Sequence, residues 1–162
     1  METIYNLIAS RLKNEITELQ WIDLDAGQLD HDEYRAAIDF PAVLIDIAFS
    51  GCENMGHSGD QTCDTVFSLR IVSQCFSETN IHAPEDIREN GLKHFRLLNE
   101  IQKALQGWSE GDEMGTLYRQ SSTPEKRNDG LKVHTVRYNT EFYDANNAIE
   151  MLEKATPELQ IQ

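Results

Sequence analysis

The chain has 162 residues, with 14 basic and 28 acidic side chains and a formal net charge of −14. This length is sufficient for one domain with a proper hydrophobic core and short for two. A negative field of this size repels phosphate backbones and anionic lipid head groups, so nucleic acid and membrane surfaces are poor candidate partners.

The first segment is predicted to be an amphipathic helix, because its apolar residues recur at spacings of three and four. These residues are Ile4, Leu7, Ile8, Leu12, Ile16 and Leu19. The segment has no basic region ahead of an unbroken apolar run, so we expect no secretion signal. Residues 21–24 then indicate a short strand, and the acidic segment that follows, DAGQLDHDEYR, is expected to form an exposed loop.

A strand is predicted to begin at Pro41, because proline lacks a backbone N–H and is tolerated at the first residue of a strand. The pleat separates a row of large side chains from a row of mostly small ones that includes Asp46. The large ones are Val43, Ile45, Ile47 and Phe49. We expect helices to cover the first face, and Asp46 to be a solvated carboxylate on the less covered face.

Residues 50–64, SGCENMGHSGDQTCD, are predicted to form a long, flexible loop that leads to an antiparallel strand in DTVFSLRIVSQCF. The chain has three cysteines, and this odd number suggests reduced thiols in a cytoplasm. Cys52, His57 and Cys63, with Cys75 further on, lack the close pairing of structural zinc ligands. We therefore expect no metal site.

The strongest predicted helix begins near Pro84 and ends before Gly107. Its expected inner stripe is Ile87, Gly91, His94, Phe95, Leu98, Ile101 and Leu105. A short strand around TLYRQS, a charged loop STPEKRNDG and a long strand from Leu131 to Tyr143 follow. The inward-facing residues of this last strand change phase, which predicts a β-bulge near His134 or Thr135.

These elements predict an α+β domain over residues 1–144, with a mainly antiparallel sheet of four to five strands packed against two main helices. Residues 145–162 are expected to form a short helix, near residues 146–154, and a loose tail.

No motif in the sequence specifies a chemistry. The segment GHSGD resembles a nucleophile elbow, but it leads into a strand where the elbow requires a helix. The segment DLDAGQLDHDE lacks the glycine and the final glutamate of a calcium-binding loop. We therefore predict no catalytic residues and no cofactor. The alternative is a ligand-binding or enzymatic site assembled from dispersed residues, for instance Asp46, Arg70 and His94.

The order of elements and several short sequence segments resemble those of a known family. These segments are PAVLI at the start of a strand, LLNEIQKALQGW at the end of the long helix, and a late strand that follows DG and ends in tyrosines and an acidic residue. Over roughly residues 2–144 the chain is similar to the small tail terminator, or tail completion, proteins of long-tailed bacteriophages, including the Mu-like branch.

The resemblance implies a structural role without catalytic residues. Members of the family form a ring, commonly of six subunits, that stops growth of the tail tube and offers a docking face to the head connector. Such a protein would reside in the virion tail, after assembly in the bacterial cytoplasm, or in the cytoplasm when expressed from a prophage. A stand-alone ligand-binding or enzymatic domain, and an adaptor for one cellular protein, remain alternatives.

A closed ring requires two different surfaces on each subunit. The sequence offers Met55 and His57 in the loop 50–64, and Lys126 and Arg127 in the charged loop, which could meet the acidic segment of a neighbouring subunit. The candidate acidic contacts in that segment are Asp23, Asp25, Asp30 and Asp32.

Overall fold

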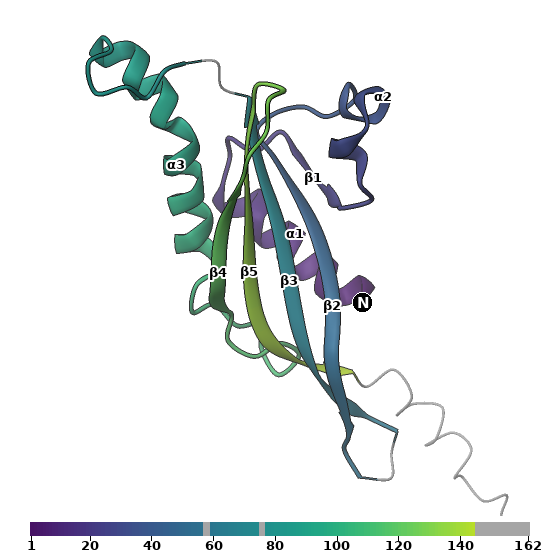
Figure 1. The fold of residues 1–162 in the computed structure, drawn as a ribbon. Helices are drawn as coiled ribbons and strands as arrows, with labels where there is room; N and C mark the ends of the chain where they lie inside the picture. Colours follow the sequence, from purple (N-terminus) through teal and green to yellow (C-terminus); the bar gives the residue numbers. More distant parts are fainter. Residues whose placement is uncertain (57–58, 75–76, 145–162) are drawn as a thin grey trace, which may run out of the picture.

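The computed structural model describes residues 1–56, 59–74 and 77–144, and it has a five-stranded mixed sheet with its two long helices on one face (Figure 1). The elements in chain order are α1 (Glu2–Glu15), β1 (Trp21–Leu24), the 3-10 helix η1 (Gln28–Asp30), α2 (Asp32–Arg35), β2 (Ala42–Asn54), β3 (Gln61–Gln74), α3 (Glu85–Leu105), β4 (Tyr118–Glu125) and β5 (Leu131–Asp144). The expected α+β class is confirmed. The expected C-terminal helix and tail lie outside the described residues.

The strands lie in the order β1-β2-β3-β5-β4. β1 pairs parallel to β2, and every other neighbouring pair is antiparallel. The centre of the sheet is formed by β2, β3 and β5, which are long and pair along most of their length. β1 is short and lies beside only the beginning of β2. The two edges of the sheet are therefore unequal.

The main core lies between the sheet and the helices α1 and α3. Ile4, Ile8 and Leu12 of α1 are buried, as the helical spacing predicts. α3 contributes its C-terminal half, including Leu97 and Ile101, to the same core. Ile87 and Phe95 were expected in this stripe but are 39% and 48% exposed, respectively. Both side chains are exposed because the N-terminal half of α3 diverges from the strands (Figure 1).

A smaller cluster covers one end of the opposite face. It consists of Leu29, Ile38, Ala42, Leu44, Val72, Leu131 and Val133. Leu131 and Val133 therefore face this cluster, whereas Val136 and Tyr138 face the main core. The phase change along β5 arises from these two cores, because β5 pairs with β3 without a register shift. The bulge predicted near His134 or Thr135 is thus wrong, and the irregularity lies in β4, between Arg119 and Ser121.

Asp46 lies on the open part of this second face. Its side chain is exposed, and it pairs across the strands with Ser68 of β3. The prediction of a solvated carboxylate is confirmed.

Replacing Asp46 with asparagine is expected to change the free energy of unfolding by less than about 1 kcal/mol, as most exposed substitutions do. Thermal melts of the two proteins at neutral pH and low protein concentration provide the measurement. A loss of several kcal/mol would show that the carboxylate is paired and buried in solution.

Candidate functional site

The charged loop after β4 and the acidic segment after β1 come together within one chain. Nη1 of Arg127 lies 3.0 Å from Oδ1 of Asp30, and Nη2 donates to the backbone oxygen of Leu29 at 3.2 Å. Arg35 bridges the same two segments through Asp129, at 2.8 Å. We expected these segments to meet between neighbouring subunits. The contact is instead intramolecular and holds the η1–α2 segment against the end of the sheet.

Arg70 lies at the centre of this charge network. It projects from β3, its side chain is only 14% exposed, and its guanidinium contacts three carboxylates. These are Glu125 at 3.0 Å, Asp30 at 3.0 Å and Asp25 at 3.4 Å. Sequence reasoning named Arg70 only as one member of a dispersed site, because a single arginine in a strand does not reveal its partners.

The network fixes the ionisation of its carboxylates. Hydrogen bonds from Arg70 lower the pKa of Asp30 to about 2, against the opposing effect of burial. Burial acts to raise the pKa of Glu125, but hydrogen bonds from Arg70 and Thr135 outweigh it, and the pKa is lowered. These groups are therefore charged at neutral pH, as a structural ion-pair network requires.

The residues proposed for subunit contacts differ in their availability. Met55, Lys126 and Asp32 are exposed. Asp25 and Arg127 are largely buried in the charge network, each with a side chain that is 14% exposed. Asp23 is half-buried and accepts a hydrogen bond from the backbone N–H of Leu24. His57 lies outside the described residues, and the role of the set in assembly stays a prediction.

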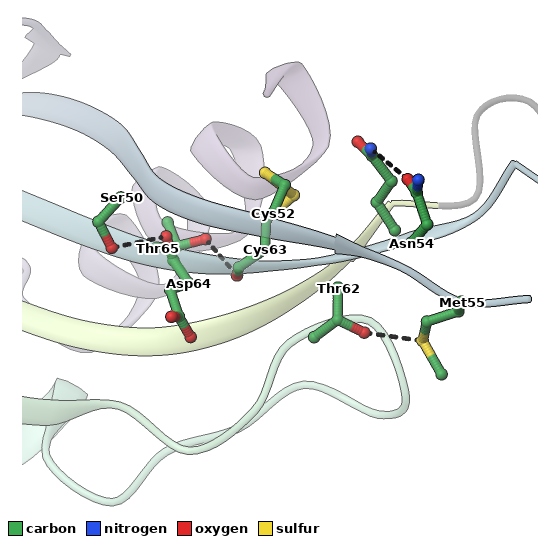
Figure 2. Close-up of a disulfide and its surroundings, with 9 residues drawn as sticks. Ser50, Cys52, Asn54, Met55, Thr62, Cys63, Asp64 and Thr65 are labelled. Carbon is green, nitrogen blue, oxygen red and sulfur yellow. Dashed lines mark hydrogen bonds between the residues drawn. A yellow bond between two sulfur atoms is a disulfide. The ribbon is translucent and has the colours of Figure 1, made fainter.

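Most of the predicted loop 50–64 is ordered as a two-stranded arm. β2 continues to Asn54 and β3 begins at Gln61, with a register shift after Phe49. Cys52 and Cys63 lie directly opposite each other and form a disulfide (Figure 2). The prediction of a long loop is thus wrong, and so is that of reduced thiols at Cys52 and Cys63; Cys75 lies outside the described residues. The sequence signal for this pairing is the spacing of the two cysteines, which an antiparallel pair of strands places opposite each other.

Side-chain contacts join the two strands of the arm near its tip. Thr62 contacts the sulfur atom of Met55, and the amide of Gln61 donates to that of Asn54 at 2.8 Å (Figure 2). Tyr143 of β5 contacts Asp60 through its hydroxyl group, at 2.8 Å. The arm is therefore a defined extension of the sheet, supported on one side by the end of β5.

We predict that the folded protein binds no structural metal. Within the described residues no group of three or more His, Cys, Asp or Glu side chains is arranged to hold a metal ion; His57 and Cys75 lie outside them. Elemental analysis after dialysis against a chelator is the measurement, and an unchanged melting temperature is expected. Near-stoichiometric zinc, with loss of folding on its removal, would refute this prediction.

A second polar cluster lies on the helix side of the sheet. Oγ of Ser73 is 2.6 Å from Nδ1 of His94, and Nε2 of His94 is 2.9 Å from Nδ1 of His134. A cavity of about 340 Å³ borders Ser73 and His94. Arg70 and Asp46 face the opposite side, so the suggested site of Asp46, Arg70 and His94 is not assembled. Sequence reasoning could name no partner for His94.

His94 is predicted to make the protein acid-sensitive. Burial, followed by the charges of His134 and Lys132, lowers the pKa of His94 to about 4 from an ordinary value of 6.5. The unfolded chain therefore binds a proton at a higher pH than the folded chain does. The stabilising contribution is complete above pH 6.5 and is lost as the pH falls towards 4.

Urea unfolding between pH 4 and 7 gives the measurement. The slope of stability against pH in this range is expected to decrease in a His94→Gln variant. An exposed-site control, His82→Gln, is expected to retain the slope of the unmodified protein. Equal slopes in all three proteins would contradict the assignment.

No protein-family model matches this chain, and a search of curated proteins finds no match. No helix in the described part of the chain is long and apolar enough to cross a membrane.

Proposed function

We propose that this protein is a tail-terminator-like structural protein of a bacteriophage or prophage, which forms a ring at the end of the tail tube and connects it to the head. The observation that carries the proposal is the arm formed by residues 51–56 and 59–64. It extends beyond the helix-covered part of the sheet, and its exposed residues include Met55, which is 51% exposed (Figure 1). An ordered arm with little cover from its own chain is suited to contact with other subunits.

Two further features support this proposal. The order of the main elements, from α1 through the β2–β3 hairpin and α3 to β4 and β5, is the order on which the family resemblance rests. The net charge of −14 also suits a ring around a passage for DNA, because the phosphate backbone is repelled from its walls.

Deletion of the gene from the phage or prophage that carries it tests the proposal. We expect headless particles whose tails have irregular lengths, and restoration of normal particles when the gene is supplied in trans. An antibody against the protein should label the head-proximal end of the tail in electron micrographs. Normal particles after deletion would overturn the proposal.

A second candidate function is hydrolysis of a small substrate, which the Ser73–His94–His134 cluster favours. A serine, a histidine base and a group that orients the base form the general pattern of an activated nucleophile. The cavity beside Ser73 provides space for a small ligand. Labelling of Ser73 by a fluorophosphonate, absent in a Ser73→Ala variant, would support this function; no labelling of the folded protein would reject it.

A further inference from the structure

The outer edge of β2 is open along most of its length. β1 pairs only with Ala42–Ile45, and the last contact is the backbone N–H of Asp25 donating to the oxygen of Ile45 at 2.8 Å. Beyond it, no described strand lies beside β2 on this edge. Because the polar backbone groups of alternate residues point to the same edge, those of Ile47 and Phe49 point outward. Such an edge is a template for another strand.

The opposite edge of the sheet is β4, and only its central part is suitable for pairing. The backbone N–H of Arg119 already donates to Oε1 of Gln106 at 2.9 Å. At the other end of β4, Pro124 lacks a backbone N–H and so cannot donate a hydrogen bond to an added strand. The residues between these two points are mostly exposed and include Ser121 and Ser122. This segment is similar in length to the free part of β2 before its register shift.

The two edges carry opposite charges. Asp46 and Glu53 are exposed along β2, whereas Arg119 on β4 and Arg137 on the neighbouring β5 are exposed near the other edge. None of these four side chains forms a salt bridge within the described residues. In a chain with a net charge of −14, two arginines without a carboxylate partner at one edge indicate a site for an acidic surface.

The positions of the charges agree with a continued sheet. Asp46, Ser68, Arg137 and Ser121 occupy one row across β2, β3, β5 and β4. Strands are spaced about 4.8 Å apart, so a strand added beyond β4 would lie about 10 Å from β5. Arg137 can span this distance across the small side chain of Ser121. A neighbouring Asp46 would then be within its reach.

We propose that β4 of one copy pairs antiparallel with the free edge of β2 in the next copy, with Arg137 facing Asp46. β2 and β4 run in opposite directions within one sheet, so copies related by rotation about an axis along the strands present them antiparallel. A two-fold pairing of β2 with itself would instead bring acidic edges together. The inference rests on the proposed ring and assigns the surfaces that close it.

Charge reversal in the full-length protein tests this interface. Sedimentation velocity over a range of concentrations should show that Arg137→Glu and Asp46→Lys each weaken association by about tenfold or more, which is about 1.4 kcal/mol or more. The variant with both substitutions should recover most of the association. A matched control, Lys13→Glu on α1, should associate like the unmodified protein.

Amide hydrogen exchange provides an independent readout. The amides of Ile47 and Phe49 should become protected on association in the unmodified protein and remain unprotected in Arg137→Glu. A two-fold dimer through β2, reversals without effect, unchanged exchange at these amides, or a monomer at every soluble concentration would each overturn edge pairing. The gene deletion tests the proposed function separately. If deletion causes tail defects but the copies do not pair through β2 and β4, the proposed ring function stands and only this interface is rejected.

Discussion

Replacing Gly91 with alanine is expected to lower the free energy of unfolding by about 1–3 kcal/mol, as other forced insertions into a packed site do. Gly91 is buried on α3, where the segment before the helix passes across it. A Cβ atom at this position would lie 2.7 Å from the backbone oxygen of Glu78 and 2.9 Å from Cγ2 of Thr79. The first of these contacts involves backbone, so a side-chain rotation cannot relieve it.

The sign of this effect is diagnostic, because alanine is favoured over glycine by about 1 kcal/mol in an unobstructed helix. Urea unfolding at pH 7 gives the measurement. Asn99→Ala, at an exposed position of the same helix, is the matched control and should be neutral or slightly stabilising. If Gly91→Ala proved more stable than the unmodified protein, residues 78 and 79 would not lie against the helix in solution.

Replacing Arg70 with methionine is expected to destabilise the fold by about 2–4 kcal/mol, near the values for breaking a buried ion pair from one side. Methionine retains much of the apolar stem but leaves Asp25, Asp30 and Glu125 without their shared partner. The same measurement on Arg119→Met should show little change at low concentration, because Arg119 is exposed and forms no salt bridge with a described residue. Equal losses of stability in the two variants would mean that the ion pairs of Arg70 do not stabilise the fold.

The Arg70 variant should also lose part of its acid sensitivity. In the folded protein the pKa of Asp30 is about 2, below the ordinary value of 3.8. The contribution of this group is therefore complete above pH 3.8 and is lost as the pH falls towards 2. The stability difference between the unmodified protein and Arg70→Met should shrink over this range. A constant difference would show that Arg70 does not lower the pKa of Asp30.

The sequence was informative wherever one periodicity determined burial. The alternation around Asp46 predicted both the strand and the face of its carboxylate, and the spacing from Ile4 to Leu12 predicted the buried side of α1. The prediction of burial failed along β5, because this strand faces two cores. Val133 is buried in the smaller cluster and Val136 in the main core. Periodicity describes one strand at a time, whereas this pattern depends on what covers each face.

Contacts between distant segments were beyond sequence reasoning for a different reason. Arg70 and Glu125 are 55 residues apart, and His94 and His134 are 40 apart, so no local spacing joins them. The Cys52–Cys63 pair is closer, at a separation of 11 residues, but the sequence did not show the register in which the two strands pair. The charged segments were recognised correctly as complementary, yet chain topology decided that they meet within one molecule.

The bridge between Cys52 and Cys63 makes the stability of the arm depend on its surroundings. Closing a loop of this size restricts the unfolded chain and stabilises the folded one by about 3 kcal/mol. In a reducing cytoplasm this contribution is absent, and the arm is held by its backbone hydrogen bonds, its side-chain contacts and the end of β5. If the protein is part of a released particle, the arm is therefore most adaptable while subunits assemble and becomes fixed only after the particle has left the cell.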